Sequence, residues 1–167
     1  MSNIVEFANL KITIEENPKQ VTYRFSGDVD EHFKQTKVPR IRKDTIVFHL
    51  ADVNNFNSCG IREWIHLVQE FGKLGHLVFR ECSVTMIDQI NMVPGSLGTG
   101  EIESFYAPYY CECGGEVNRL ITMNEARPFL ANRTAPELNC QRCGKTLEFD
   151  ALEESYFLFA STLQNAG

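Results

Sequence analysis

Two kinds of hydrophobic pattern follow one another along the first two thirds of the chain. Apolar residues occupy every second position within 10–15 and again within 21–25, which is typical of half-buried strands. The turn-forming sequence 16–19 lies between these strands, so they are predicted to form a β-hairpin. Within 61–71 the apolar residues instead recur at helical spacing and include Trp64, predicting a helix that ends near Gly72 or Gly75.

The remaining segments extend this alternation of strands and helices. The patterns predict, in order, a short helix over 30–35, a central strand over 45–50, a polar loop over 54–58, a strand over 77–79, a helix over 84–92, a strand over 102–110, a ribbon strand over 147–149 and a packed helix over 153–163. The order β-β-α-β-α-β-α-β indicates an α/β fold with a mixed, partly parallel sheet and right-handed crossovers.

The bulk composition narrows the class of protein. The 167 residues are 43% apolar and 23% charged, which suffices for a sizeable core, and the net charge of −6 argues against a nucleic-acid partner. No apolar run reaches membrane-spanning length, and the N-terminus lacks the pattern of a signal peptide. Six cysteines in such a chain indicate metal binding in a reducing compartment, so we expect a cytoplasmic protein without membrane contact.

Four of the cysteines form two tight pairs, each followed by glycine. They are Cys111 and Cys113 in Cys-Glu-Cys-Gly-Gly, and Cys140 and Cys143 in Cys-Gln-Arg-Cys-Gly-Lys. Four thiolates in two such turns suit a tetrahedral Zn²⁺, and they leave no open position for water, so the predicted zinc is structural. Iron is the alternative, because tetrahedral S₄ sites suit both metals. The intervening segment is predicted to form a small hairpin, which completes a zinc ribbon.

The strand-to-helix loop carries a resemblance to a known family. The strand over 46–50 leads through a polar loop into Asn57-Ser58-Cys59-Gly60-Ile61 at the start of the predicted helix. This segment resembles the STAS domain, the fold of anti-sigma-factor antagonists and sulfate-transporter tails, whose pattern is a buried strand and then Asp-Ser-Ser-Gly-Leu. The sequence 27–30, Gly-Asp-Val-Asp, is similar to that family's Gly-x-Ile-Asp. The resemblance covers roughly residues 10–110.

The resemblance implies a protein-interaction domain whose contact surface includes Asn55, Asn57, Ser58, Cys59 and Gly60. The family's phosphoacceptor is the serine immediately before the glycine, where this chain has Cys59, and the family's first aspartate is replaced by Asn57. The usual phospho-switch is therefore not expected. Ser58 could accept a phosphate instead, although helix capping by Asn57 or Ser58 explains these residues more simply.

Cys59 allows two interpretations. A thiol at a helix N-terminus can have a lowered pKa and respond to oxidants, or it can be a small buried or half-buried packing residue. The absence of a nearby base or resolving thiol in the sequence favours packing. His32, His49, His66 and His76 are scattered without a catalytic spacing, so no enzymatic activity is expected.

Together these patterns predict three parts: a STAS-like domain over 1–107, a zinc ribbon over 108–150 and a short helical tail over 151–167. The expected function is a non-enzymatic interaction module in bacterial signalling, with an anti-sigma-type kinase relative or another regulatory protein as partner. The alternative is a redox- or metal-responsive sensor that uses Cys59 or the four-thiolate site.

Overall fold

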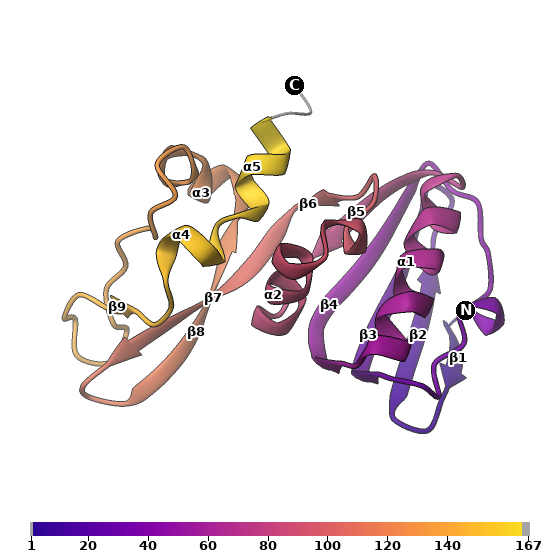
Figure 1. Cartoon of the computed structure of the whole chain (residues 1–167), viewed down its shortest axis with the longest axis horizontal. Helices are drawn as coiled ribbons and strands as arrows, with labels where there is room; N and C mark the ends of the chain where they lie inside the picture. The colour runs from indigo at the N-terminus through magenta and orange to yellow at the C-terminus, as the bar shows by residue number, and fades with distance from the viewer. Residues whose placement is uncertain (1, 165–167) are drawn as a thin grey trace.

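The computed structural model describes the backbone of residues 2–164 and the side chains of residues 3–161. Two sheets share the chain (Figure 1). The larger has the order β1-β2-β3-β4-β5-β6 and the smaller β8-β7-β9. Strands of the larger sheet are β1 (Ser2–Glu6), β2 (Leu10–Glu16), β3 (Gln20–Val29), β4 (Thr45–Phe56), β5 (His76–Arg80) and β6 (Glu101–Ile102). β1 to β3 pair antiparallel, and β3 to β6 pair parallel, which confirms the mixed α/β sheet.

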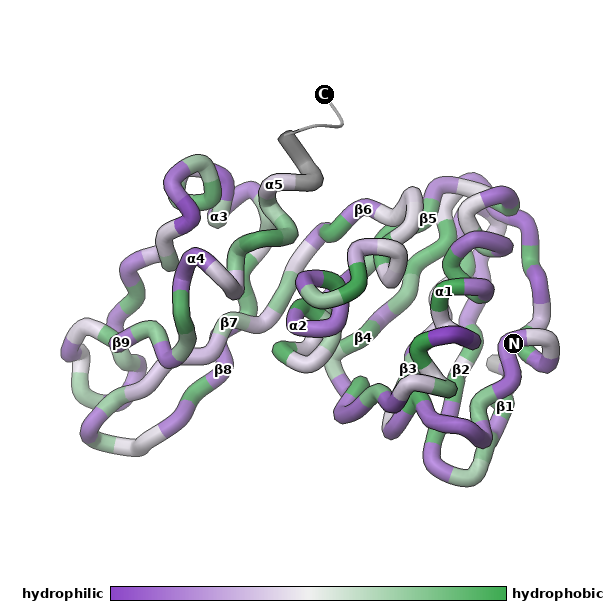
Figure 2. Tube along the Cα trace, viewed as in Figure 1, coloured by the Kyte–Doolittle hydropathy of each residue, from purple (hydrophilic) through white to green (hydrophobic). Residues whose placement is uncertain are grey.

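The predicted hairpin is β2 and β3. Ile12 pairs with Phe25 and Ile14 with Tyr23, and all four side chains are buried on one face. The alternation of apolar and polar residues along these strands is visible in Figure 2. Burial of every second residue on one face therefore sets the register, because a slip by one residue would turn the apolar set toward solvent.

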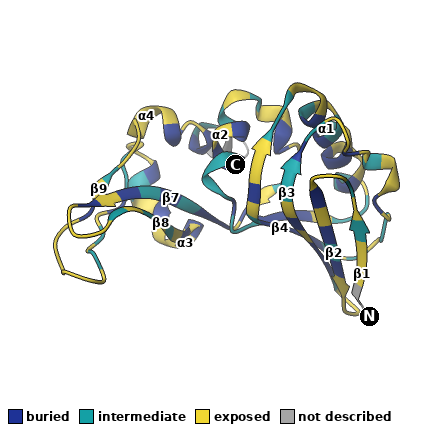
Figure 3. Cartoon of the chain, turned by 90° about the horizontal axis from the view of Figure 1, so that it is seen from below, coloured by how far each residue is buried: buried dark blue, intermediate teal, exposed yellow. Residues whose placement is uncertain are grey.

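Helices α1 (Ser58–Gly72) and α2 (Val84–Met92) cover one face of the larger sheet and leave the other face open (Figure 3). Trp64 on α1 is fully buried and packs its ring against Phe25, Phe48 and Phe79 of three strands. Its indole N–H donates to the carbonyl of Ser96, 2.9 Å away, in the short 3-10 helix η2 (Pro94–Ser96). The core position predicted for Trp64 is confirmed.

Two predictions in the first half were wrong, and one strand was not predicted. Residues 30–35 do not form a helix, because the Asp30 carboxylate accepts the His32 N–H in a turn, and only the 3-10 helix η1 (Gln35–Lys37) follows. β4 does not end at residue 50 but continues to Phe56, paired with β3 across two register shifts. β1 was missed, since its apolar residues are largely exposed at the sheet edge.

The predicted strand over 102–110 is two strands in different sheets. β6 belongs to the larger sheet, whereas β7 (Ser104–Cys111) pairs with β8 (Gly115–Thr122) and β9 (Glu148–Phe149) in the smaller one. The chain passes from the larger sheet to the smaller one at Glu103. The N–H of Glu103 donates to the Phe79 carbonyl in β5, and its carbonyl accepts from the N–H of Met123, just after β8. Local periodicity cannot reveal this change, because both strands are extended and apolar.

The segment between the two cysteine pairs is longer in structure than a small hairpin. It contains β8, helix α3 (Met123–Leu130) and an extended stretch that leads to Cys140. Thr122 and Glu125 begin α3 with a reciprocal capping box. The small hairpin predicted between the two pairs was therefore wrong, although the four cysteines still meet.

The C-terminal segment forms two short helices, α4 (Glu153–Tyr156) and α5 (Phe159–Gln164), where one helix over 153–163 was predicted. Asn91 of α2 links them: its amide N–H donates to the Tyr156 carbonyl at 2.7 Å, and its Oδ1 accepts the Phe159 N–H at 2.8 Å. Phe157 is fully buried between them, and its ring stacks on Phe149 of β9.

One hydrophobic core runs through both sheets. It joins α1 and the larger sheet to α2, β7 and the aromatic residues of α4 and α5. The predicted boundary at 107/108 falls inside β7, so the division into three parts stays a prediction.

Replacing Asn91 tests how the C-terminal helices are held. Asn91→Ala removes both hydrogen bonds and is expected to lower the free energy of unfolding by about 1–3 kcal/mol. Urea unfolding measures the change. Asn124→Ala is the matched control, because Asn124 is an exposed residue of α3 and the substitution has the same effect on helix propensity. Equal unfolding midpoints for the two variants would contradict this role of Asn91.

Candidate metal centre

The first cysteine pair lies on the turn between β7 and β8. Cys111 is the last residue of β7 and pairs with Gly115, the first of β8, which leaves a three-residue turn that contains Cys113. Gly115 has a φ of +79°, a conformation that glycine adopts without strain. The short Cys-x-Cys spacing therefore fits a tight hairpin, which brings the two sulfurs to 3.4 Å.

The second pair lies on a tight turn of its own. The N–H of Cys140 donates to the Lys145 carbonyl at 2.8 Å, and the N–H of Gly144 donates back to Cys140 at 2.9 Å. Gly144 has a φ of +76°, so each pair is followed by a glycine in the left-handed region, as the sequence predicts. Cys143 lies within this turn.

Contacts from the smaller sheet position the second turn. The hydroxyl of buried Tyr109, in β7, donates to the Pro136 carbonyl at 2.7 Å. Burial raises the pKa of Tyr109 to about 12, so this hydroxyl keeps its proton. The N–H of Leu147, which is buried, donates to Leu138, so the two sides of the turn are paired. The strand that carries Cys111 thus also anchors the segment that leads to Cys140.

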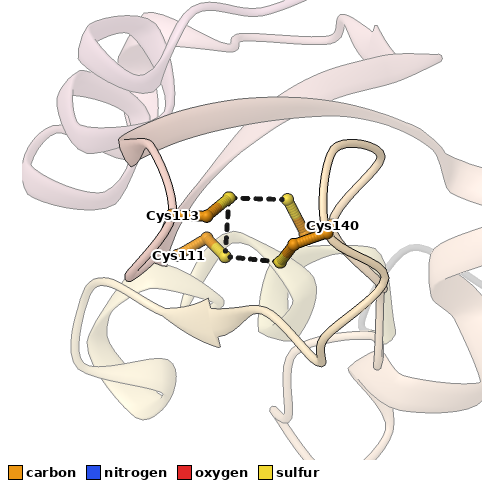
Figure 4. A group of neighbouring side chains, drawn as sticks. Cys111, Cys113 and Cys140 are labelled. Atoms are coloured by element: carbon orange, nitrogen blue, oxygen red, sulfur yellow. Dashed lines mark hydrogen bonds between the residues drawn. The ribbon is translucent and has the colours of Figure 1, made fainter.

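The four sulfurs face one another (Figure 4). The Sγ atom of Cys111 lies 3.5 Å from that of Cys143, and the Sγ atom of Cys113 lies 3.5 Å from that of Cys140. All four sulfurs lie within 4.8 Å of one another. A metal with bonds of about 2.3 Å to four tetrahedral sulfurs would place them about 3.8 Å apart. The cluster therefore fits a four-coordinate metal ion with little movement.

The surroundings of the sulfurs shift the pKa values of two of the thiols in opposite directions. The backbone N–H groups of Cys143 and Arg142 stabilise the thiolate of Cys140 and lower its pKa to about 6. Cys113 lies among the other three sulfurs, and its hydrogen bond with Cys111 is the largest of the effects that raise its pKa to about 12. Without a cation the cluster therefore does not hold four negative charges, and a divalent metal would supply the compensation.

The donor set favours a closed, structural site. Cys111 is buried, Cys140 is half-buried, and Cys113 and Cys143 are exposed. Four thiolates fill the tetrahedron, so a bound metal would keep no position for water or substrate. The prediction that these four cysteines meet in one site able to hold a metal ion is confirmed.

The other predicted site residues lie where β4 ends and α1 begins. Asn57 is the N-cap of α1, and its Oδ1 accepts the Gly60 N–H at 2.9 Å, as capping predicts. Asn55 and Ser58 are exposed. Cys59 is also exposed, so the interpretation as a buried or half-buried packing residue was wrong, whereas Cys82 is fully buried and its pKa is raised by burial.

A cluster of polar side chains at the change of sheets was missed. Glu81 has a φ of +49°, which is uncommon for a residue with a side chain, and its carboxylate contacts His49 and accepts from the Tyr106 hydroxyl. These residues come from β4, the end of β5 and β7. The sequence places them more than twenty residues apart, so their meeting depends on the topology of the strands.

Comparison with protein-family models finds none that matches the chain, and no curated protein matches it. The resemblance to STAS domains therefore stays a prediction. Among the described residues, no helix has the length and apolar character needed to cross a membrane.

The metal affinity should rise with pH, and the slope of its logarithm against pH should change near pH 6. Cys113 must lose a proton on binding at any pH below its pKa of about 12, so the affinity should rise about tenfold per pH unit from this thiol. Cys140 competes with protons only below its pKa of about 6. The slope of the logarithm of affinity against pH should therefore fall by about one on crossing pH 6. Zinc titration against a chelator between pH 5 and 8 measures it, and pH-independent affinity would contradict the site.

Proposed function

We propose that this chain is a non-enzymatic protein-interaction module of a bacterial signalling system, similar to anti-sigma-factor antagonists, with a structural zinc site in its C-terminal part. The observation that carries the proposal is the junction of β4 and α1. There a helix start with fixed backbone presents Ser58 and Cys59 to solvent.

The backbone of this junction has little freedom. Gly60 packs so closely on β3 that a Cβ atom there would stand 1.8 Å from the Val29 carbonyl oxygen. The N–H of Asn57 donates to the same carbonyl, and its side chain caps the helix. A surface that is ordered before binding loses less conformational entropy on association, which supports a role in recognition.

Carboxylates surround the start of α1. Glu31 accepts a hydrogen bond of 2.6 Å from the Asn57 amide, and hydrogen bonds from its own backbone N–H and from Asn57 lower the pKa of Glu31. Asp30 lies next to it and is held by Asn9. Negative charge here would oppose a phosphate on Ser58 and would favour a partner with a basic surface. We propose an anti-sigma-type kinase relative or another regulatory protein that binds the unmodified loop.

Zinc is the metal that we propose for the four cysteines. Thiolate ligands favour Zn²⁺ over the hard cations Mg²⁺ and Ca²⁺, and a tetrahedral site imposes no penalty on an ion without geometric preference. Iron suits the same ligands and is the alternative. In either case the closed ligand set supports a structural rather than a catalytic role.

Charge substitutions in the loop test the interaction surface. Ser58→Lys and Cys59→Lys each add a cation beside Glu31 and should weaken binding of the native partner at least tenfold, because the added charge offsets the carboxylates and repels a basic partner surface. Affinity capture from the native cell with mass spectrometry identifies the partner, and titration of the purified pair measures the loss.

The matched control is His66→Lys, at an exposed residue of α1 two turns from the loop. Retention of every captured partner by Ser58→Lys and Cys59→Lys, at wild-type affinity, would argue against an interaction surface at this junction.

A redox- or metal-responsive sensor is the second candidate. The observation that favours it is the exposure of Cys113 and Cys143, together with exposed Cys59. Peroxide would join two thiolates in a disulfide and be reduced to water, and the two remaining sulfurs would hold the metal poorly.

Mild peroxide treatment separates the two candidates. For the interaction module we expect the zinc content and the partner affinity to stay within about twofold of the untreated protein, because bound zinc lowers the nucleophilicity of the thiolates. Zinc release measured with a chromogenic chelator is the readout, and Cys59→Ser reports any contribution from the loop thiol. Full release of zinc, together with partner binding that falls below one partner per chain, would favour the sensor instead.

A further inference from the structure

Two arginines connect the cysteine turns in opposite directions. Arg119 lies on β8, the strand that leaves the first turn, and its Nη1 donates to the carbonyl of Asn139 at 3.1 Å. Asn139 immediately precedes Cys140. The first turn therefore reaches the backbone of the second through one guanidinium group.

The second arginine makes the reverse connection. Arg142 lies between Cys140 and Cys143, and a Cβ atom on Gly114 would stand 2.6 Å from its Nη1 and 3.5 Å from its Cζ. Gly114 immediately follows Cys113, so the Arg142 side chain lies against the backbone of the first turn. Glycine at position 114 leaves room for it.

Both arginines border the same hollow as three of the cysteines. Arg119 and Arg142 line a hollow of about 220 Å³ together with Cys111, Cys113 and Cys140. Four thiolates and a divalent cation have a formal charge of −2, and two guanidinium groups carry +2. Glu116 lines the same hollow and opposes this compensation, and Glu112 is exposed between the first two cysteines. The hollow thus contains charges whose effects on the metal centre have opposite signs.

We propose that Arg119 and Arg142 are positioning residues of the metal centre, which hold the two cysteine turns together and offset the negative charge of a divalent tetrathiolate. The inference rests on the metal site of the proposed function and is independent of the interaction surface at the β4–α1 junction. Groups that orient the ligands of a metal commonly change its affinity by ten- to a hundredfold, although they do not touch the ion.

The test is the affinity of the full chain for Zn²⁺, measured by competition with a chelator at pH 7. Arg119→Ala and Arg142→Ala should each weaken binding roughly tenfold. Gly114→Ala should weaken it in the same direction, because the new methyl group displaces the Arg142 guanidinium while φ at this position lies outside the left-handed region. Arg127→Ala, an exposed arginine of α3 outside the hollow, should leave the affinity unchanged.

Three further measurements distinguish charge compensation from general loosening of the fold. Glu116→Gln should tighten zinc binding, which loss of structure would not do. Arg119→Lys should recover part of the affinity, since it keeps the charge and one donor. The difference between wild type and the alanine variants should shrink in 1 M salt, where the screening length is about 3 Å.

The outcomes are separable. If the wild-type chain binds one zinc and both arginine-to-alanine variants bind it with an affinity within twofold of wild type, the inference is overturned and the metal site remains supported. Wild-type chain that binds no zinc overturns both. Equal weakening by Glu116→Gln and the alanine variants overturns the charge argument. Circular dichroism of each variant shows that the fold is retained.

Discussion

The backbone of Cys82 makes the two hydrogen bonds on which the arrangement of the two sheets depends. Its N–H donates to the Ser104 carbonyl at 3.1 Å, and its carbonyl accepts from the Tyr106 N–H at 2.8 Å, so the start of β7 is paired with Cys82, two residues after the end of β5. Beyond this point β7 leaves the larger sheet. Because the Cys82 side chain is fully buried in the hydrophobic core, this pairing is shielded from water. β7 then runs directly to Cys111, so the direction of the first cysteine turn is set within the core.

The same residues explain how far the sequence could predict the molecule. Helix α2 was predicted within its observed bounds, because Ser83 caps it and Pro94 follows it, and both signals are local. The meeting of the four cysteines was predicted from spacing alone. The change of sheet at Glu103 was not, since it depends on which distant strand accepts the backbone hydrogen bonds, and neither were α3 nor the contacts of Arg119 and Arg142. These arginines were visible in the sequence only as part of a mixed-charge flank.

The cysteine cluster and the β4–α1 junction differ in how they could meet a partner. At the cysteine cluster every sulfur faces the other sulfurs, so a bound metal would be closed to outside ligands. At the β4–α1 junction the polar groups are satisfied within the turn, yet Ser58 and Cys59 stay exposed. Their presentation depends on Gly60, since any side chain there would collide with the Val29 carbonyl and shift the start of the helix. The closed cluster is suited to stability, and the open junction is suited to recognition.

A metal would act on a segment of irregular backbone. Residues 131–139 form neither a helix nor a regular strand. Arg133 donates to Ser161, and Thr134 donates to the Phe129 carbonyl. Closer to Cys140, the segment is held by the bond from Tyr109 to Pro136, the pairing of Leu138 with Leu147, the bridge between Asn139 and Thr146, and the contact of Arg119 with Asn139. Closing a loop of this length costs entropy that grows slowly with chain length, so one cross-link at its ends removes much of the disorder of the whole segment. A four-sulfur ligand set supplies that cross-link between Cys113 and Cys140. The core therefore orients the first turn through β7, and the metal with its two arginines would bring the second turn to it.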